Sequence, residues 1–174
     1  MSNNIQIREM LETDAEMISS ALLCQGWDKP VTLYRQYFQE TCAGKRTVLV
    51  ASQDGDFAGY VTILWESDYP SFQAQNIPEI ADFNVLLKYR RQGIGNALMQ
   101  FAEVCTAKRT DVVGIGVGLT ADYGAAQILY VKRGYIPDGL GIFQGRRHLE
   151  QGDQAQIDHD IALYFTKRIA AVKP

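Results

Sequence analysis

Two arginines and two glycines lie close together in the segment Arg90–Gly95, between an apolar stretch and an amphipathic one. The first backbone N–H groups of a helix lack partners within the helix, and the helix dipole adds partial positive charge there. Gly93 and Gly95 carry no Cβ, so an anion can approach the backbone closely. Arg90 and Arg91 add positive charge beside them. The pattern predicts a site for a phosphate or pyrophosphate group.

Two other nucleotide-binding motifs were considered for the same chemistry. No segment supplies the G-x-x-x-x-G-K-[ST] pattern of a Walker A loop. Gly116–Ala121 matches the G-x-G-x-x-A pattern of dinucleotide-binding turns, but its glycines continue an alternation that starts at Gly114. That alternation predicts a strand with one bare face, which another backbone or a flat ligand can approach closely. A nicotinamide-dependent oxidoreductase is therefore kept as the weaker alternative.

Hydrophobic periodicity predicts the elements that must position the Arg90–Gly95 turn. Strands are expected at residues 5–8, 47–52, 57–65, 79–87 and 112–119, with further β structure to residue 165. Helices are expected at about 13–24, 34–41, 96–108 and 122–133. Thr13 and Glu16 have the spacing of a capping box, and residues 67–78 are expected to form a loop. This mixture predicts an α/β (α+β) domain with a mixed sheet and one parallel crossover.

Length and composition indicate one domain. The chain has 174 residues, of which 47% are hydrophobic and 21% charged, so disorder and a long coiled coil are excluded. Its net charge of −3 argues against binding nucleic acid by neutralising phosphates. No apolar run has the length of a membrane span or a signal sequence. With three widely spaced cysteines, which fit a reducing compartment, we expect a cytoplasmic protein with no nucleic-acid or membrane partner.

The segment Asp158–Asp160, with His159 at its centre, is the clearest candidate for a metal site. Neighbouring residues of a strand point to opposite faces, so its three side chains cannot easily converge on one ion. No other cluster of histidine, cysteine and carboxylate residues has the spacing of a metal site. No metal cofactor is expected.

Two segments resemble one known family. Arg90-x-x-Gly93-x-Gly95, which follows an apolar strand, is similar to the acetyl-CoA signature of the GNAT N-acetyltransferases. The segment Ala126–Tyr135 is similar to that family's A-x-x-L-Y-x-x-x-G-F/Y pattern, and the order of elements agrees from about Ile5 to Phe165. The resemblance implies a single GNAT domain over residues 1–174. Its sheet would be mostly antiparallel, with one splayed parallel strand pair and helices on both faces.

The resemblance also implies that acetyl-CoA is a co-substrate. In the family, the strand that corresponds to Phe83–Leu87 binds the pantetheine arm and diverges from the strand that corresponds to Val112–Leu119. The pyrophosphate would lie on backbone N–H groups of Arg91–Asn96, and an N–H near Asn84 or Val85 would stabilise the oxyanion. Tyr123 stands where the family often has asparagine. The implied cofactor-binding residues are Phe83, Asn84, Val85, Arg90, Arg91, Gln92, Gly93, Ile94, Gly95, Asn96 and Tyr123.

Three residues are candidates for the proton transfers. Tyr130 stands where many family members have a tyrosine that protonates the departing thiolate, although a tyrosine on a helix face can also serve packing alone. Asp82 and Glu79 are candidate general bases. Because they are three residues apart on one strand, they point to opposite faces, and only one can face the acceptor. An ordered water is the third candidate for the base.

The sequence therefore predicts an acetyl-CoA-dependent N-acetyltransferase that acts on a primary amine by direct attack in a ternary complex. The alternative is a non-catalytic acyl-CoA-binding or regulatory module on the same fold. The expected partner is a small-molecule or peptide amine, and a homodimer is compatible with the family. Acidic residues near the C-terminus favour either a cationic amine or simply a solvated face: Glu150, Asp153, Asp158 and Asp160.

Overall fold

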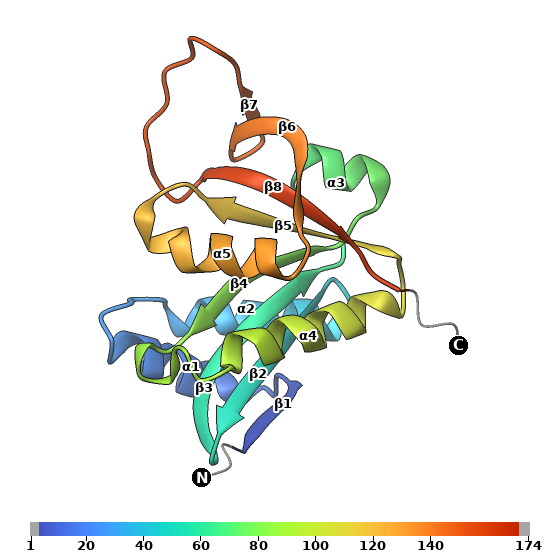
Figure 1. The fold of residues 1–174 in the computed structure, drawn as a ribbon. Helices are drawn as coiled ribbons and strands as arrows, with labels where there is room; N and C mark the ends of the chain where they lie inside the picture. The colour runs from blue at the N-terminus through green and yellow to red at the C-terminus, as the bar shows by residue number, and fades with distance from the viewer. Residues whose placement is uncertain (1–3, 171–174) are drawn as a thin grey trace. The chain divides into compact units, whose positions relative to one another are not determined.

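The computed structural model describes residues 4–170 of the chain (Figure 1). Residues 1–3, which belong to the N-terminal segment searched for a signal sequence, lie outside that range, as do residues 171–174. Among the described residues, no helix combines the length and the apolar character needed to cross a bilayer.

The described strands form one eight-stranded sheet in the order β1-β2-β3-β4-β5-β8-β6-β7. Their bounds are β1 Ile5–Glu9, β2 Arg46–Gln53, β3 Asp56–Leu64, β4 Glu79–Val85, β5 Val112–Gly118, β6 Ile136–Gln144, β7 Arg147–Leu149 and β8 Ile161–Arg168. β4 and β5 pair in parallel, whereas β1–β2, β2–β3, β5–β8, β6–β7 and β6–β8 pair antiparallel. The prediction of a mixed, mostly antiparallel sheet with one parallel pair is confirmed.

The chain divides into two compact units. Within the described residues, unit 1 comprises 4–65 and 81–105, and unit 2 comprises 66–80 and 106–170. Strand β4 contributes its first two residues to unit 2 and the others to unit 1. A single domain over residues 1–174 stays a prediction.

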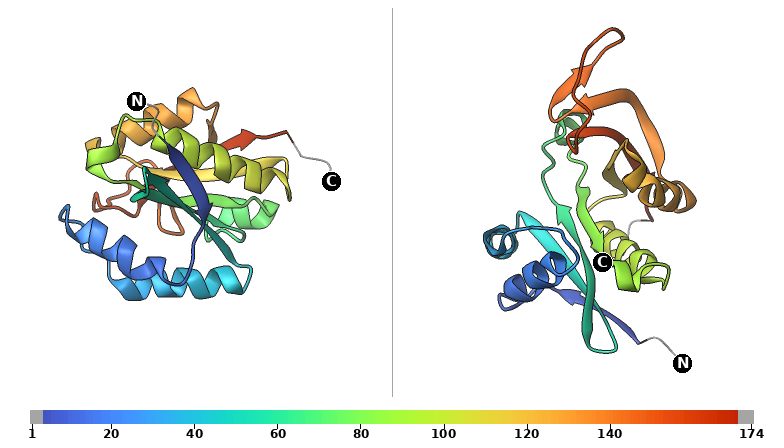
Figure 2. Two further views of the ribbon diagram at one scale, coloured as in Figure 1. Left: turned by 90° about the horizontal axis from the view of Figure 1, so that it is seen from below. Right: turned by 90° about the vertical axis from the view of Figure 1, so that its left-hand side faces the viewer.

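Unit 1 is built on the central strands β2 and β3. Helices α1 (Asp14–Leu23) and α2 (Val31–Cys42) cover one face of these strands, and α4 (Ile94–Ala107) covers the other (Figure 2). Strand β3 is buried over nearly its whole length, as its apolar sequence predicts. Gly59 allows β3 to approach β4, because a Cβ at this position would overlap the main-chain oxygen of Asn84. The core beneath α1 and α2 includes Ile18, Leu22, Tyr34, Val48 and Tyr60.

The predicted capping box at Thr13 does not form. Thr13 has helical backbone angles and makes no side-chain capping bond. Asp14, the first residue of the helix, instead reaches back along the chain, because its carboxylate accepts a bond from the Leu11 N–H at 2.8 Å and from Arg8 at 2.6 Å. Glu16 forms an ion pair with Arg35 on α2. Both acidic residues of the first turn thus make contacts that sequence spacing does not predict.

Unit 2 contains a short helix where the sequence analysis expected only a loop. Helix α3 (Pro70–Gln75) begins with proline at its first turn, a position where the missing N–H costs nothing, and it ends at Asn76 in the left-handed conformation. Its Phe72 is fully buried and covers Gly114 of β5. Two prolines predict a loop in this segment, but one of them, Pro70, begins a helix.

The alternating glycines of β5 serve packing inside unit 2. A Cβ at Gly114 would overlap the ring of Phe72, one at Gly116 would lie 3.0 Å from the Tyr164 ring, and one at Gly118 would lie 2.5 Å from the Tyr123 ring. The bare face predicted from the sequence is thus occupied by three aromatic rings. The glycines of the G-x-G-x-x-A match lie within a strand and not in a phosphate-binding turn, which removes the main support for a nicotinamide site.

Candidate functional site

The turn before α4 belongs to unit 1 and has the backbone geometry that the sequence predicted. A 3₁₀ turn at Leu87–Tyr89 leads into Arg91 and Gly93, whose φ angles are 62° and 91°. Glycine adopts this left-handed region without the penalty that a Cβ brings, which explains its presence at position 93. The Ala97 N–H donates to the Gly93 carbonyl at 3.0 Å, so helical bonding begins here. The helix start therefore directs its first N–H groups out of the turn.

Side chains around the turn hold its shape. The Arg90 guanidinium lies over the Trp27 ring, 5.5 Å from its centroid, and its Nε donates to the Val85 carbonyl at 3.4 Å. The Gln92 amide donates to the Lys88 carbonyl at 2.8 Å and accepts a bond from Gln53 at 2.9 Å. The side chains of Arg90 and Gln92 thus brace the turn, while Ile94 anchors the helix start in the core.

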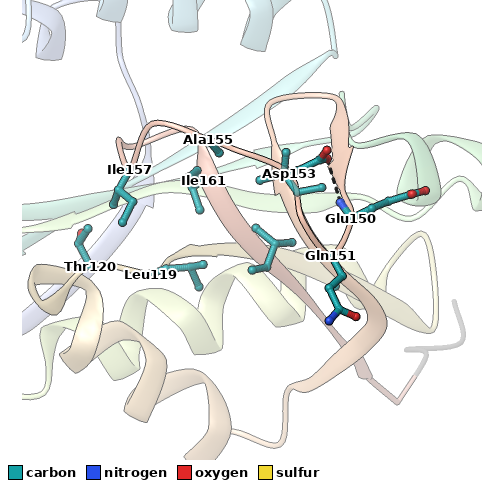
Figure 3. A pocket seen from close by; sticks show the side chains of 11 residues that line it. Leu119, Thr120, Glu150, Gln151, Asp153, Ala155, Ile157 and Ile161 are labelled. Atoms are coloured by element: carbon teal, nitrogen blue, oxygen red, sulfur yellow. Dashed lines mark hydrogen bonds between the residues drawn. The ribbon is translucent and has the colours of Figure 1, made fainter.

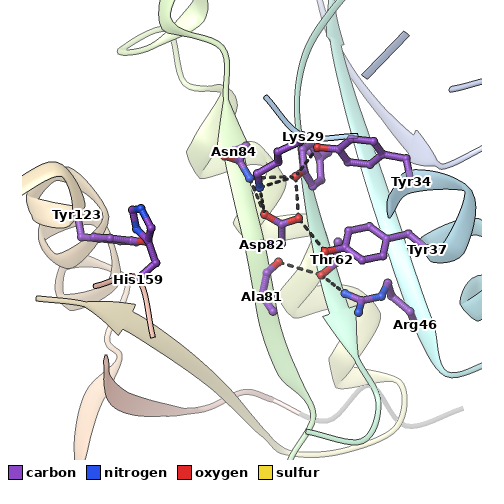
Figure 4. A network of polar contacts seen from close by, with 11 residues as sticks. Lys29, Tyr34, Tyr37, Arg46, Thr62, Ala81, Asp82, Asn84, Tyr123 and His159 are labelled. Atoms are coloured by element: carbon purple, nitrogen blue, oxygen red, sulfur yellow. Dashed lines mark hydrogen bonds and ion pairs between the residues drawn. The ribbon is translucent and has the colours of Figure 1, made fainter. Parts of the chain in front are cut away.

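Strand β4 carries Asp82 at the centre of a polar network in unit 1 (Figure 4). Its Oδ1 accepts bonds from Lys29 Nζ at 2.5 Å and Asn84 Nδ2 at 2.8 Å. Its Oδ2 accepts bonds from Tyr60 Oη at 2.7 Å and Tyr37 Oη at 3.0 Å. An ionised carboxylate has about four acceptor positions, and here four donors fill them.

The phenols around Asp82 stay protonated well above neutral pH. Burial, and then the negative charge of Asp82, raise the pKa of Tyr37 and of Tyr60 far above the ordinary value. Burial also raises the pKa of Tyr34, which contacts Tyr60 through an oxygen–oxygen distance of 3.2 Å. Each phenol therefore acts as a permanent donor to the network. Nothing in the sequence pattern links Lys29 or these tyrosines to Asp82.

Glu79, the other candidate base, lies in unit 2 with different neighbours. The Ser67 hydroxyl donates to Glu79 Oε2 at 2.5 Å, and Ser67 is itself buried and accepts a bond from the Tyr69 N–H at 3.0 Å. Glu79 Oε1 lies beside Gly116 of β5, next to the Tyr164 ring. Burial, and then the charge of Glu79, raise the pKa of Tyr164 to about 12. Glu79 is thus a half-buried carboxylate held by a neutral hydroxyl.

Tyr130 lies on α5 (Gly124–Lys132) of unit 2 and is 5% exposed. Its ring centroid lies 6.0 Å from that of Tyr135, in a tilted arrangement. Burial raises the pKa of Tyr130 above the ordinary tyrosine value. A phenol in this state keeps its proton at neutral pH and can donate a hydrogen bond.

Tyr123 ends the 3₁₀ turn Ala121–Tyr123 between β5 and α5. Its ring lies against Gly118, and its hydroxyl lies 3.1 Å from His159 Nδ1 (Figure 4). Gln127 on α5 donates to the Gly118 carbonyl at 2.9 Å, which ties the helix to the end of β5. The ring of Tyr123 therefore packs within unit 2. A contact between Tyr123 and a cofactor stays a prediction.

A pocket of about 610 Å³ opens within unit 2 (Figure 3). Its walls are mostly apolar and come from Leu119, Ile142, Leu149, Ala155, Ile157 and Ile161. Glu150 and Asp153 contribute carboxylates, but Asp153 is already engaged by the Glu150 N–H at 3.0 Å and by Arg147 at 3.2 Å. These two contacts, the hydrogen bond first, hold the pKa of Asp153 below its usual value. The volume suits a small organic ligand.

Among residues 4–170, no group of three or more histidine, cysteine and acidic side chains is arranged to hold a metal ion. Within Asp158–Asp160, Asp158 accepts bonds from the Asp160 N–H at 2.9 Å and from Gln144 at 3.4 Å. His159 contacts Tyr123 instead. Asp158 and His159 thus have different partners, and residues 158–160 form a turn and not the strand that the alternation argument assumed.

A family model described as the acetyltransferase (GNAT) domain matches residues 44–137, which is more than half of the chain. This chain belongs to the GNAT family. The matched region includes strand β4, the Arg90–Gly95 turn and helix α5, so it contains both segments that carried the resemblance. Acetyl transfer is accordingly the chemistry of the family to which the chain belongs.

Solved structures of GNAT acetyltransferases share the fold at low sequence identity. The RimL ribosomal L7/L12 α-N-protein acetyltransferase, in complex with coenzyme A, has a TM-score of 0.71 and 13% identity over 98% of this chain and 97% of that one. A ribosomal-protein-alanine N-acetyltransferase from Brucella melitensis has a TM-score of 0.69 and 19% identity, over 94% and 99%. YncA from Salmonella typhimurium, with its cofactor acetyl-CoA, has a TM-score of 0.67 and 14% identity, over 95% and 94%. No curated protein sequence is a significant match.

Proposed function

We propose that this GNAT protein transfers the acetyl group of acetyl-CoA to a primary amine, by direct attack of the amine in a ternary complex. The observation that carries the proposal is the Arg90–Gly95 turn, in which Gly93 is left-handed and α4 begins at Ile94. Backbone N–H groups at a helix start bind phosphate oxygens well. A GNAT chain with such a turn therefore has backbone N–H groups suited to binding a diphosphate.

The residues of the turn fit the diphosphate of acetyl-CoA. A residue with a side chain would be strained at position 93, where the φ angle is 91°. Glycine therefore stands there, and its backbone is not covered by a side chain. Arg91 is exposed and adds positive charge. Bound acetyl-CoA supplies an activated thioester. Backbone N–H groups at Phe83, Asn84 or Val85 are the proposed donors to its carbonyl oxygen, where negative charge develops during attack.

We propose Glu79 as the general base in preference to Asp82. A free alkylamine has a pKa of about 10.4, so it must lose a proton before or during attack. The four acceptor positions of Asp82 are filled, one of them by the Lys29 ammonium. Glu79 is fixed by the neutral Ser67 hydroxyl and lies next to the Tyr164 ring of unit 2.

The proposed reaction balances without a covalent enzyme intermediate. The amine nitrogen forms a bond to the acetyl carbon, and the carbon–sulfur bond then breaks. The amine attacks in its neutral form, after its ammonium proton has passed to solvent, and the second proton that the nitrogen loses goes to Glu79, directly or through water. The departing thiolate, whose parent thiol has a pKa of about 8.5, takes the proton of Tyr130. Proton exchange with solvent afterwards restores Glu79 and Tyr130. Binding both substrates together supplies most of the entropic advantage.

The test is a screen of purified protein with acetyl-CoA and amines, read as release of free CoA thiol. The panel spans alkylamines, arylalkylamines, peptide N-termini and lysine peptides, because the unit 2 pocket offers apolar walls together with the exposed Glu150. We expect release that depends on one amine class, with acetylated product found by mass spectrometry. Release at the same rate without any amine would contradict the proposal.

A non-catalytic acyl-CoA-binding module is the second candidate, and the filled acceptor positions of Asp82 are the observation that favours it. This module would bind acetyl-CoA tightly in calorimetry and release no thiol with any amine of the panel. The two candidates thus differ in turnover and agree in cofactor binding, so the same preparation distinguishes them.

A further inference from the structure

We propose that Asp82 is a positioning residue, which uses the Lys29 ammonium and three further donors to fix the direction of the β4 backbone N–H groups at Phe83–Val85. The inference rests on the proposed function, in which those N–H groups face the thioester oxygen. It assigns Asp82 a role other than proton acceptor. It also assigns a role to Lys29, which lies in the connection between α1 and α2.

The backbone at Asp82 is unusual for a strand. Its φ angle is 41°, in the left-handed region. The other described non-glycine residues with positive φ lie in turns or at a helix end: Asp54, Asn76 and Arg91. Such a residue within a strand turns the next peptide groups away from the regular pattern. It persists only where surrounding contacts hold it, and such places are common at functional sites.

The contacts that hold Asp82 come from four parts of unit 1. Lys29 precedes α2, Tyr37 lies on α2, Tyr60 on β3 and Asn84 on β4 itself, and each donates to the carboxylate at 2.5–3.0 Å. Tyr60 Oη is also within hydrogen-bond distance of Lys29 Nζ, at 3.2 Å, and of Asn84 Nδ2, at 3.1 Å. Four donors therefore hold the carboxylate of Asp82, and because the side chain is held, the main chain at this residue has little freedom.

The main chain is also held on either side of Asp82. Before it, the Thr62 hydroxyl donates to the Ala81 carbonyl at 3.0 Å, and Arg46 donates to Thr62 at 2.9 Å (Figure 4). After it, the main-chain oxygen of Asn84 lies so close to Gly59 that no Cβ would fit there. The left-handed residue thus lies between two fixed points. The orientation of the following N–H groups has little freedom while the carboxylate keeps its donors.

The experiment compares Asp82→Asn, Lys29→Met and a control, Tyr34→Phe. Tyr34 is buried in the same cluster and contacts Tyr60 but not Asp82, so its change tests packing without removing a donor from the carboxylate. The first readout is the backbone amide signals of Phe83, Asn84 and Val85 in ¹⁵N–¹H spectra. We expect these signals to move in both Asp82→Asn and Lys29→Met, and to stay in place in Tyr34→Phe.

The second readout is steady-state kinetics on the amine found in the screen. Misplacement of oxyanion donors by about 1 Å costs roughly 100-fold, so kcat of Asp82→Asn should fall by about that factor while KM for acetyl-CoA changes little. The acid limb of the pH–rate profile should remain in Asp82→Asn. Lys29→Met should lose kcat in the same direction, by a smaller factor.

Two results would overturn the proposal. One is loss of the acid limb in Asp82→Asn, which would make Asp82 the base. The other is unchanged amide signals at Phe83–Val85 in a folded Asp82→Asn protein. If the wild-type protein transfers no acetyl group, the proposed function fails, and the spectra alone still decide whether Asp82 sets the backbone of β4.

Discussion

Glu79 and Asp82 are two carboxylates on one strand, three residues apart, with opposite surroundings. Asp82, in unit 1, accepts bonds from an ammonium, an amide and two phenols. Glu79, in unit 2, is held by the Ser67 hydroxyl beside Tyr164 and a glycine strand. The difference shows that the position of a carboxylate on a strand says little about the chemistry of its neighbours. Its donors decide whether it is suited to structure or to proton transfer.

The comparison extends to the two units. Unit 1 carries the turn before α4, which suits cofactor binding, and Asp82, whose four filled acceptor positions suit it to positioning. Unit 2 carries Glu79 and Tyr130, to which we assign the proton transfers. Changes in unit 2 should therefore lower kcat, and a change in the turn of unit 1 should lower cofactor affinity.

Glu79→Gln has the largest expected effect. Loss of a general base lowers the rate by about 10²–10⁴-fold, so kcat should fall within that range, and the acid limb of the pH–rate profile should disappear. Acetyl-CoA affinity, measured by calorimetry, should change little. Asp82→Asn in parallel should keep the acid limb. A Glu79→Gln enzyme with an intact acid limb would reverse the proposed assignment of the two carboxylates.

Tyr130→Phe comes next. Loss of the acid should lower kcat by about 10²-fold near neutral pH, with little change in acetyl-CoA affinity. The defect should shrink as the pH passes about 8.5, because the thiolate then needs no proton to leave. Tyr135→Phe is the matched control, since its ring is buried 6.0 Å from that of Tyr130. Equal losses in both variants, independent of pH, would indicate packing alone.

Gly93→Val should act on binding. The added side chain strains a residue with a φ angle of 91° and covers the helix start, so the Kd for acetyl-CoA should rise at least about tenfold, or about 1.4 kcal/mol. Gly44→Val is the control, because Gly44 is also left-handed, with a φ angle of 72°, and lies after α2 with open space around it. Calorimetry on both should show weaker binding in Gly93→Val alone. Unchanged acetyl-CoA affinity in Gly93→Val would indicate that the diphosphate binds at another place.

The smallest expected effect is on stability at high pH. The pKa of Tyr164 is raised to about 12, above the ordinary value of about 10, so the unfolded chain loses this proton first. The stabilisation is therefore complete below pH 10 and is lost as the pH rises from 10 towards 12, by at most about 1.4 kcal/mol per pH unit. Urea unfolding between these pH values should show a shallower decline for Tyr164→Phe. Equal slopes would contradict the raised pKa.

Local patterns predicted most of the fold. The first five strands, the four longer helices and the turn at Arg90–Gly95 follow from periodicity and glycine placement, and their observed bounds differ by a few residues, whereas the last three strands were expected only as further β structure. Helix α3 was missed because Pro70 is both a loop signal and a good first helical residue. The ion pair of Asp14 with Arg8 could not be read from the helix pattern because Arg8 lies on the preceding strand.

The surroundings of the candidate bases could not be predicted. Lys29, Tyr37 and Tyr60 lie 53, 45 and 22 residues from Asp82 along the chain, and only the folded unit brings them together. Sequence spacing correctly placed Asp82 and Glu79 on one strand, but it carried no information on their donors. The raised pKa that keeps each buried phenol a donor depends on tertiary burial, which sequence spacing does not show.

The three rings over β5 also determine how unit 2 can fold. Phe72, Tyr164 and Tyr123 each cover one glycine of the strand, at every second position. If β5 slipped by one residue, Val113, Ile115 and Val117 would stand beneath the rings, and their branched side chains would collide with them. The alternation therefore excludes the misaligned sheet and selects one pairing with the neighbouring strands, before any substrate is bound.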